Sequence, residues 1–162
     1  MCLEFRKISD FERGILYSLL EDAYSFDERC KKYWGADWKE FDRFFYDHLE
    51  IADKYGFLTV LNNEPIGHIS WDPRNMPAYV EIGHNCIAAE QKGNGYGKIQ
   101  LCEALRRIRT YPDLKKIIVT TNELLIPAQK NYESAGFRAL QKRENTGTAA
   151  FSGACIEYEI VN

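Results

Sequence analysis

The sequence predicts a single α+β domain over residues 1–162, with helices flanking one mixed, mostly antiparallel sheet. Three observations support this fold class. The chain has 162 residues, 45% of them hydrophobic, which is enough to bury one core. Strand-like and helix-like stretches follow in the order β-α-α-β-β-β-α-β-α-β-β. A glycine-rich turn and a helix separate the strand at 79–88 from the buried strand at 116–121, so these two strands should be parallel.

The first half of the chain begins with one strand and two helices. Residues 2–8 alternate in polarity as a strand does. Ser9 or Asp10 is expected to cap the first helix, since short polar side chains accept hydrogen bonds from first-turn N–H groups. After an irregular segment, Asp37 is expected to cap a second helix over 38–54, which has an apolar stripe at helical spacing.

Three strands are expected next. Residues 57–61 and 66–71 flank Asn62-Asn63, a pair typical of hairpin turns. Residues 79–88 form the third strand. Gly83 in its middle predicts a bulge or a close backbone approach.

The second half contains the glycine-rich turn and the remaining elements. A helix over 96–110 follows the turn, and the run KIIVTT at 116–121 is a buried strand. Pro127 suits the first turn of a short helix that ends at Ala135, with Gly136 as its left-handed cap. The last two strands are 137–142 and 155–161, joined by a loop of small and polar residues at 145–153.

Composition excludes several classes of protein. No apolar run approaches the length of a transmembrane helix, and the first residues lack the apolar core of a signal peptide. The five cysteines are scattered, which argues for reduced thiols in a cytoplasmic protein rather than a disulfide framework or a zinc site. The three histidines also lack metal-ligand spacing, so no metal is expected. No nucleic-acid motif is present and no membrane partner is expected; the protein should be a monomer or a homodimer.

Charge is unevenly distributed although the net charge is only −3. Residues 1–56 carry 13 acidic and 9 basic side chains, giving −4, whereas residues 92–116 carry seven basic and two acidic ones, giving +5. The basic excess surrounds the glycine-rich turn. It is either a solvated helix face or a field that attracts a polyphosphate.

The glycine-rich turn itself predicts an anion site. Gly93, Gly95 and Gly97 alternate immediately before and within the start of a helix. Without Cβ atoms the backbone can approach a phosphate closely, and the first N–H groups of the helix have no partners within the helix. Glycines also make ordinary tight connections, so the turn alone is weak support.

Two motifs resemble the GNAT superfamily of N-acetyltransferases, which transfer an acetyl group from acetyl-CoA to an amine. The stretch EIGHNCIAAEQKGNGYG resembles the family's strand and pyrophosphate loop, Q/R-x-x-G-x-G/A, with Lys92 at the Gln/Arg position. PAQKNYESAGF, from Pro127 to Phe137, resembles the family's A-x-x-x-Y-E-x-x-G-F segment. The order of elements matches over the whole chain. One departure is Leu125, where the family often has Asn; Asn122 is a possible substitute.

The resemblance implies an acetyl-CoA cosubstrate and a set of residues that hold it. The backbone of 86–88 should pair with the pantetheine arm, and the N–H groups of 93–98 should hold the pyrophosphate. The residues expected around the cosubstrate are Cys86, Ile87, Ala88, Lys92, Gly93, Asn94, Gly95, Tyr96, Gly97, Lys98, Asn122 and Ala128.

Acetyl transfer to an amine requires a base, because an alkyl ammonium has a pKa of about 10.4 and must lose a proton before attack. Glu81 is the expected base. It lies eleven residues before Lys92, and the resemblance to the histone-acetyltransferase branch implies a catalytic glutamate at that offset. A solvent-facing strand Glu is the alternative. His84 is the rival base, since its ordinary pKa is near neutrality.

After attack, the departing thiolate needs a hydrogen-bond donor and the oxyanion needs another. Tyr132 resembles the family's tyrosine that donates to the sulfur, although a packing role on its helix is the alternative. Backbone N–H groups of residues 85–87 are candidates for the oxyanion. A covalent mechanism through Cys86 is disfavoured, because buried cysteine ordinarily acts as a small hydrophobe.

The leading hypothesis is therefore direct acetyl transfer from acetyl-CoA to a primary amine. The alternative from another class is a CoA-binding sensor or adaptor that has lost catalysis. Such a protein would keep the glycine-rich turn, but it would need neither a base, Glu81 or His84, nor Tyr132. The acidic, aromatic segment 21–50 is where the resemblance places the acceptor, and its composition would suit a cationic amine.

Overall fold

The computed structural model describes residues 2–144 and 154–162. Its seven strands form one sheet in the order β1-β2-β3-β4-β5-β7-β6, in which β4 and β5 are parallel and the other neighbours antiparallel. The strands are β1 (Leu3–Arg6), β2 (Gly56–Leu61), β3 (Glu64–Asp72), β4 (Val80–Ile87), β5 (Lys116–Asn122), β6 (Arg138–Arg143) and β7 (Cys155–Val161). The helices are α1 (Ile15–Ala23), α2 (Glu28–Asp47), α3 (Leu49–Lys54), α4 (Tyr96–Ile108) and α5 (Ile126–Ser134), with 3-10 turns η1 (Ile8–Asp10) and η2 (Ala89–Gln91). The predicted fold class is confirmed.

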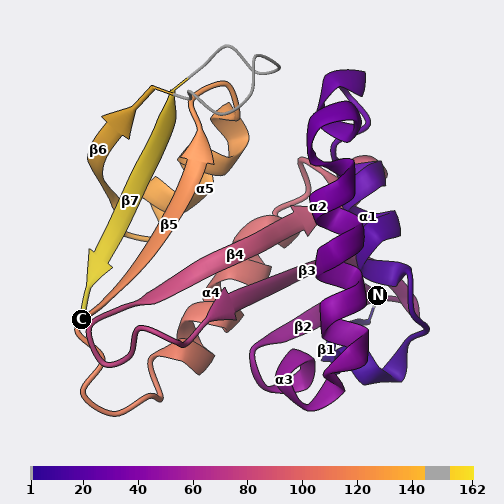
Figure 1. Cartoon of the computed structure of the whole chain (residues 1–162), viewed down its shortest axis with the longest axis horizontal. Coiled ribbons are helices and arrows are strands. Elements are labelled where there is room, and N and C mark those ends of the chain that lie inside the picture. Colours follow the sequence, from indigo (N-terminus) through magenta and orange to yellow (C-terminus); the bar gives the residue numbers. More distant parts are fainter. Residues whose placement is uncertain (1, 145–153) are drawn as a thin grey trace.

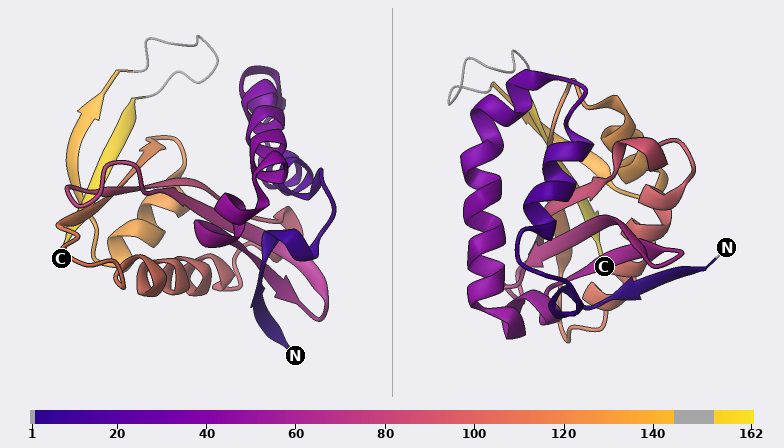
Figure 2. Two further views of the ribbon diagram at one scale, coloured as in Figure 1. Left: turned by 60° about the horizontal axis from the view of Figure 1, so that its bottom comes forward. Right: turned by 90° about the vertical axis from the view of Figure 1, so that its right-hand side faces the viewer.

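Helices cover both faces of the sheet. Figure 1 shows α1 and α2 in front of the strands, and the left view of Figure 2 shows α4 and α5 on the opposite face. Two groups of buried apolar side chains correspond to these faces. One gathers residues of α4 and α5 with the strands, among them Leu101, Ala104 and Tyr132, and the other gathers residues of α1 and α2, among them Leu16, Leu20 and Trp38.

The second helix begins ten residues earlier than the sequence predicts. Asp27 caps it, because its carboxylate accepts a hydrogen bond from the N–H of Arg29 at 3.0 Å. Asp37, the predicted cap, lies inside α2. The predicted helix over 38–54 is also divided: α2 ends at Asp47, and α3 begins after His48, whose φ of −137° interrupts the helix.

The first helix begins later than predicted and is capped from another element. Ser9 and Asp10 lie in η1, and α1 starts after Gly14. The buried Asp42 of α2 accepts hydrogen bonds from the N–H groups of Gly14 at 3.0 Å and Leu16 at 3.0 Å. A carboxylate suits this position because the N-terminus of a helix carries partial positive charge. The cap is therefore a tertiary contact.

Two predicted turns, the hairpin at 62–63 and the end of α5, agree with the structure. Asn62 and Asn63 both have positive φ (50° and 70°), as a two-residue hairpin turn requires. Gly136 follows α5 with φ 102°, and Pro127 lies in the first turn of that helix. The predicted loop 145–153 lies outside the described residues. Within the described part of the chain, no helix is long and apolar enough to cross a membrane, and no three His, Cys, Asp or Glu side chains gather in a metal-ligand arrangement.

Candidate active site

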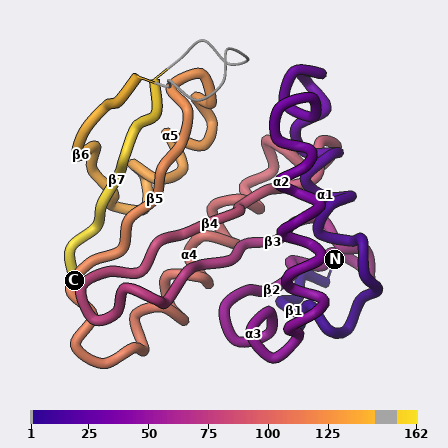
Figure 3. The backbone as a smooth tube through the Cα atoms, in the orientation of Figure 1, coloured from indigo at the N-terminus to yellow at the C-terminus, as the bar shows by residue number. Residues whose placement is uncertain are grey.

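The sheet opens between β4 and β5. These parallel strands pair at Val80–Ile117, Glu81–Ile118 and Ile82–Val119, and their pairing stops there. Both strands continue, β4 to Ile87 and β5 to Asn122, and Figure 3 shows that they diverge. Over this second half of β4, the edge that faces β5 has no strand partner. An extended ligand could therefore hydrogen-bond to that edge as a strand would.

A bulge in β4 decides which side chains face which helices. Asn85 pairs with Ile69 of β3 and Ile82 pairs with Trp71, so that Gly83 and His84 together lie opposite a single residue of β3. This confirms the predicted irregularity at Gly83. Because of the extra residue, the alternation of side chains shifts by one position along the rest of the strand.

Because of the bulge, His84 lies on the same face of the sheet as Glu81, the face covered by α1 and α2. Ile82 packs with the α4 residues in the core, so Glu81 beside it points to the opposite face. The His84 ring lies 4.2 Å from the ring of Phe41 in α2, measured between centroids. Asn85 points the other way, towards α4 and α5, where it contacts Gln100 and Tyr132.

Glu81 has the electrostatic environment of a base. It is partly buried and pairs in register with Asp72 of β3. Burial raises the pKa of the Glu81 carboxyl, and the negative charges of Asp72 and Glu157 raise it further, while Arg143 acts in the opposite direction. A carboxylate with a raised pKa accepts a proton more readily than an ordinary one.

His84 and Cys86 are poorly suited to proton abstraction and nucleophilic attack. Burial lowers the pKa of His84 to about 4, so burial makes this imidazole a weaker base, whereas it makes the Glu81 carboxylate a stronger one. Burial also raises the pKa of the Cys86 thiol to about 12, so the thiolate is scarce at neutral pH. Both observations favour Glu81 over the rival candidates.

Tyr132 lies on the other side of the sheet. The residue is 5% exposed, and its ring packs near those of Phe137 and Tyr158, with centroids 5.7 and 6.0 Å away. Its hydroxyl accepts a hydrogen bond from the amide nitrogen of Asn85 at 3.2 Å. Burial raises the pKa of Tyr132, and the bond from Asn85 opposes that shift.

The glycine-rich turn has the backbone geometry of an anion site. Gly93 and Gly95 have φ of 83° and 84°, and a Cβ at either position would meet no protein atom within 4 Å. Gly95 is the N-cap of α4 and supplies no side-chain cap to the helix. Asn94 folds back on the turn, donating to the carbonyl oxygen of Gln91 at 3.2 Å. Tyr96, Gly97 and Lys98 then form the first turn of α4.

The Lys92 side chain is engaged elsewhere. Its ammonium donates to the backbone carbonyl oxygen of Ala23, at the end of α1, and lies 4.9 Å from the centre of the Phe26 ring. A ligand in the turn would therefore meet the backbone after Lys92 rather than the Lys92 ammonium.

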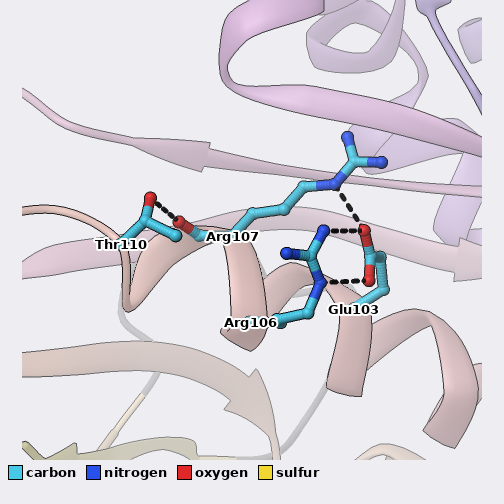
Figure 4. A network of polar contacts seen from close by, with 4 residues as sticks. All are labelled: Glu103, Arg106, Arg107 and Thr110. Carbon is cyan, nitrogen blue, oxygen red and sulfur yellow. Dashed lines mark hydrogen bonds and ion pairs between the residues drawn. The ribbon is translucent and has the colours of Figure 1, made fainter.

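The positive charge predicted around the turn is partly neutralised. Figure 4 shows Glu103 between two cations: Arg106 approaches it at 2.8 Å and Arg107 at 2.7 Å. These guanidinium groups lower the pKa of Glu103 to about 2, so the carboxylate is charged at neutral pH. Two of the seven basic residues of 92–116, Arg106 and Arg107, are therefore paired with Glu103 on α4.

The remaining predicted ligands of acetyl-CoA lie at the ends of β4 and β5 and in α5. The Ala88 N–H donates to the Ile66 carbonyl oxygen at 2.7 Å, so the alternation of the antiparallel ladder directs the N–H and C=O of Ile87 towards the open edge of β4. Asn122 ends β5, is 5% exposed, and its side-chain NH₂ has no hydrogen-bond partner. Ala128 of α5 packs against the core.

These features fit a CoA thioester. An orphaned buried donor such as the Asn122 NH₂ is costly unless something accepts its hydrogens, and a pantetheine amide oxygen would do so. The glycine-rich turn offers backbone N–H groups and helix polarity to a pyrophosphate. The open edge of β4 offers backbone groups to the arm between them.

The sequence comparison agrees with this geometry. The family model described as "Acetyltransferase (GNAT) family" matches residues 15–137. The chain belongs to the GNAT acetyltransferase family. Acetyl-CoA-dependent acetylation is thus its general chemistry, and its fold is one that binds acetyl-CoA. A search of the curated proteins found no match.

Solved structures share the fold at low sequence identity. The ribosomal-protein-alanine N-acetyltransferase of Brucella melitensis is 13% identical, with a TM-score of 0.77 and all of both chains covered. The ribosomal-protein-S18-alanine N-acetyltransferase of Escherichia coli is 12% identical, with a TM-score of 0.73 over 99% of this chain and 94% of that one. A chain of the NatC complex bound to Gag peptide and CoA is 18% identical, with a TM-score of 0.70 over 100% and 99% of the two chains.

Sequence reasoning missed two polar residues that act on predicted or candidate site residues. Gln100 is fully buried and lies on the apolar side of α4, where it contacts Asn85 of β4. Asp72, which raises the pKa of Glu81, was also missed. A glutamine among Leu101, Ala104 and other apolar residues of one helix face was the signal available for Gln100.

Proposed function

We propose that this protein is an N-acetyltransferase that moves the acetyl group of acetyl-CoA directly to a primary amine. The observation that carries the proposal is the arrangement at the β4–β5 opening. Glu81, in the last paired residues before the opening, points to the face of α1 and α2, whereas the Tyr132 hydroxyl reaches Asn85, in the unpaired half of β4, from the face of α5. A proton acceptor and a hydrogen-bond donor thus lie on opposite faces of the sheet beside the β4–β5 opening.

Glu81 would act on the acceptor side. The attacking nitrogen must lose a proton, and a carboxylate of raised pKa receives it directly or through water. The N–C bond forms as the C–S bond breaks, so the proton moves to Glu81 and the electron pair of the C–S bond moves to sulfur. The outward-facing backbone N–H of Ile87 supports the proposal as a donor for the carbonyl oxygen during this step.

Tyr132 would act on the leaving-group side. A thiol has an ordinary pKa of about 8.5 and a phenol one of about 10, so a hydrogen bond from Tyr132 stabilises the departing thiolate without complete proton transfer. Burial raises the pKa of Tyr132 and keeps its proton in place at neutral pH.

The test is acetyl transfer from acetyl-CoA to a panel of amines: a peptide beginning with alanine, an N-terminally blocked lysine peptide, and spermidine. The alanine peptide is included because two of the structural neighbours are alanine N-acetyltransferases. Glu81→Gln and Tyr132→Phe should each lower kcat/KM by about 100-fold at pH 7. Tyr158→Phe is the matched control, since it removes a hydroxyl that binds Glu133 at 3.0 Å, beside the Tyr132 ring.

Three outcomes separate the hypotheses. Transfer to at least one amine, reduced in both variants but not in Tyr158→Phe, supports the proposal. Tight binding of acetyl-CoA without transfer to any amine would favour the CoA-binding sensor or adaptor. No binding of acetyl-CoA by the folded protein would reject both.

A further inference from the structure

Four polar side chains, the last of them Tyr132, form a hydrogen-bonded series across the sheet. Thr59 of β2 donates from Oγ1 to Gln100 Oε1 at 2.7 Å. Gln100 Nε2 lies 2.8 Å from Asn85 Oδ1, and Asn85 Nδ2 lies 3.2 Å from the Tyr132 oxygen. Thr59 and Gln100 are fully buried. Each contact joins a different pair of elements, so these hydrogen bonds form only when the elements pack together.

The orientation of the Gln100 amide is fixed by its partners. Its Nε2 also lies 3.0 Å from the backbone carbonyl oxygen of His68 and 3.2 Å from that of Cys86. A carbonyl oxygen only accepts hydrogen bonds, so the group that faces both must be the NH₂. The reverse orientation would place Oε1 against two carbonyl oxygens inside the core.

The fixed Gln100 amide fixes Asn85 in turn. Because Gln100 presents NH₂, Asn85 must present its carbonyl oxygen to Gln100 and its own NH₂ to Tyr132. An amide nitrogen only donates hydrogen bonds. The Tyr132 oxygen is therefore the acceptor in this contact, and its own hydrogen remains available to another acceptor.

We propose that Asn85, held by Gln100, is a positioning residue that keeps the Tyr132 hydroxyl hydrogen directed at the CoA sulfur. This inference rests on the proposed function. Asn85 and Gln100 would together set the direction of the Tyr132 O–H bond. Without Asn85, a buried phenol could turn its hydrogen to any nearby acceptor.

The same contact tunes the donor. Burial raises the pKa of Tyr132, whereas the hydrogen bond from Asn85 lowers it. A donor to the phenol oxygen makes the O–H group more acidic and hence a stronger hydrogen-bond donor to the thiolate. Asn85 thus affects both the direction and the strength of that bond.

Asn85→Asp is the decisive variant because it preserves shape and reverses polarity. The carboxylate still accepts from Gln100, but its second oxygen now accepts from Tyr132 and takes up the hydroxyl hydrogen. We expect kcat with acetyl-CoA and the best amine of the panel to fall by about 30-fold, less than the roughly 100-fold expected for losing the donor altogether, because the hydroxyl is kept and only misdirected. The affinity for acetyl-CoA should change by less than about threefold, since pyrophosphate binding is remote from this contact.

A double-mutant cycle shows whether Asn85 acts through Tyr132. In the Tyr132→Phe background, Asn85→Asp should lower kcat by less than about twofold, because the hydroxyl it controls is gone. An equal loss of kcat in both backgrounds would overturn the proposal. Tyr111→Phe is the control for stability, since it removes the partner of Trp71 Nε1, at 2.9 Å, away from the proposed site.

A second measurement keeps the inference testable if the proposed function fails. If the wild type acetylates none of the amines, binding of CoA is compared with binding of desulfo-CoA by calorimetry at pH 9, where the free thiol is largely ionised. Preference for CoA in the wild type, lost in Asn85→Asp, supports the directed hydrogen bond. Equal binding of the two ligands by the wild type would overturn it.

Discussion

Gly95→Ala should separate the anion-binding role of the glycine-rich turn from its structural role. Gly95 has φ 84° and is the N-cap of α4. Gly14 has φ 104° and is the N-cap of α1. At both positions an added Cβ would meet no protein atom within 4 Å. Gly14→Ala is therefore a matched control with the same kind of backbone strain in another helix.

The cost in stability should be equal for the two variants. An alanine held in the left-handed region costs about 1 kcal/mol relative to glycine. For a chain of this size, 1 kcal/mol lowers Tm by about 2–4 °C. Both variants should remain folded and should show this shift.

The cost in CoA affinity should differ. An alanine at Gly95 places a methyl group in the space that the resemblance assigns to the pyrophosphate, and it favours a backbone rotation that turns N–H groups away. Loss of one hydrogen bond to a charged group amounts to about 1.5–3 kcal/mol. Calorimetric titration with CoA should therefore give a Kd raised roughly tenfold to 100-fold for Gly95→Ala, and an unchanged Kd for Gly14→Ala. Equal affinities in all three proteins would show that the turn is only a connection.

Two further predictions concern the base and the sheet. Glu81 accepts a proton only when it is ionised, so activity should be present above its pKa and lost as the pH falls through it. Burial and the charge of Asp72 raise that pKa, so the acidic limb of the kcat/KM profile should lie above the ordinary Glu value of about 4.3. Asp72→Asn should move this limb to lower pH. An unshifted limb in Asp72→Asn would contradict this assignment. In the neighbouring strands, Gly67→Ala should lower the free energy of unfolding by about 3 kcal/mol, because its Cβ would lie 2.5 Å from a carbonyl oxygen of β4. Gly83→Ala, whose Cβ would lie 3.5 Å from its nearest neighbour, should change that free energy by less than about 0.5 kcal/mol; similar urea midpoints for the two variants would refute this reading of the β3–β4 contact.

The sequence was sufficient for features that depend on neighbours in the chain. Asn62-Asn63 predicts its hairpin because both residues tolerate positive φ. Gly136 predicts the end of α5 for the same reason. The strand, glycine-rich turn and helix around Gly95 predict a parallel return strand, because crossover connections follow that rule. In each case the cause lies within a few residues or in a single connection.

The tertiary structure alone decided the features that depend on residues far apart in sequence. The cap of α1 comes from Asp42, 26 residues after Leu16, so no local pattern could place it. The contact of Gln100, Asn85 and Tyr132 joins three elements whose alignment follows from the bulge at Gly83 and the packing of two helices on the sheet. Periodicity tells which face of an element is buried, whereas the partner across the core is fixed only when the elements pack together.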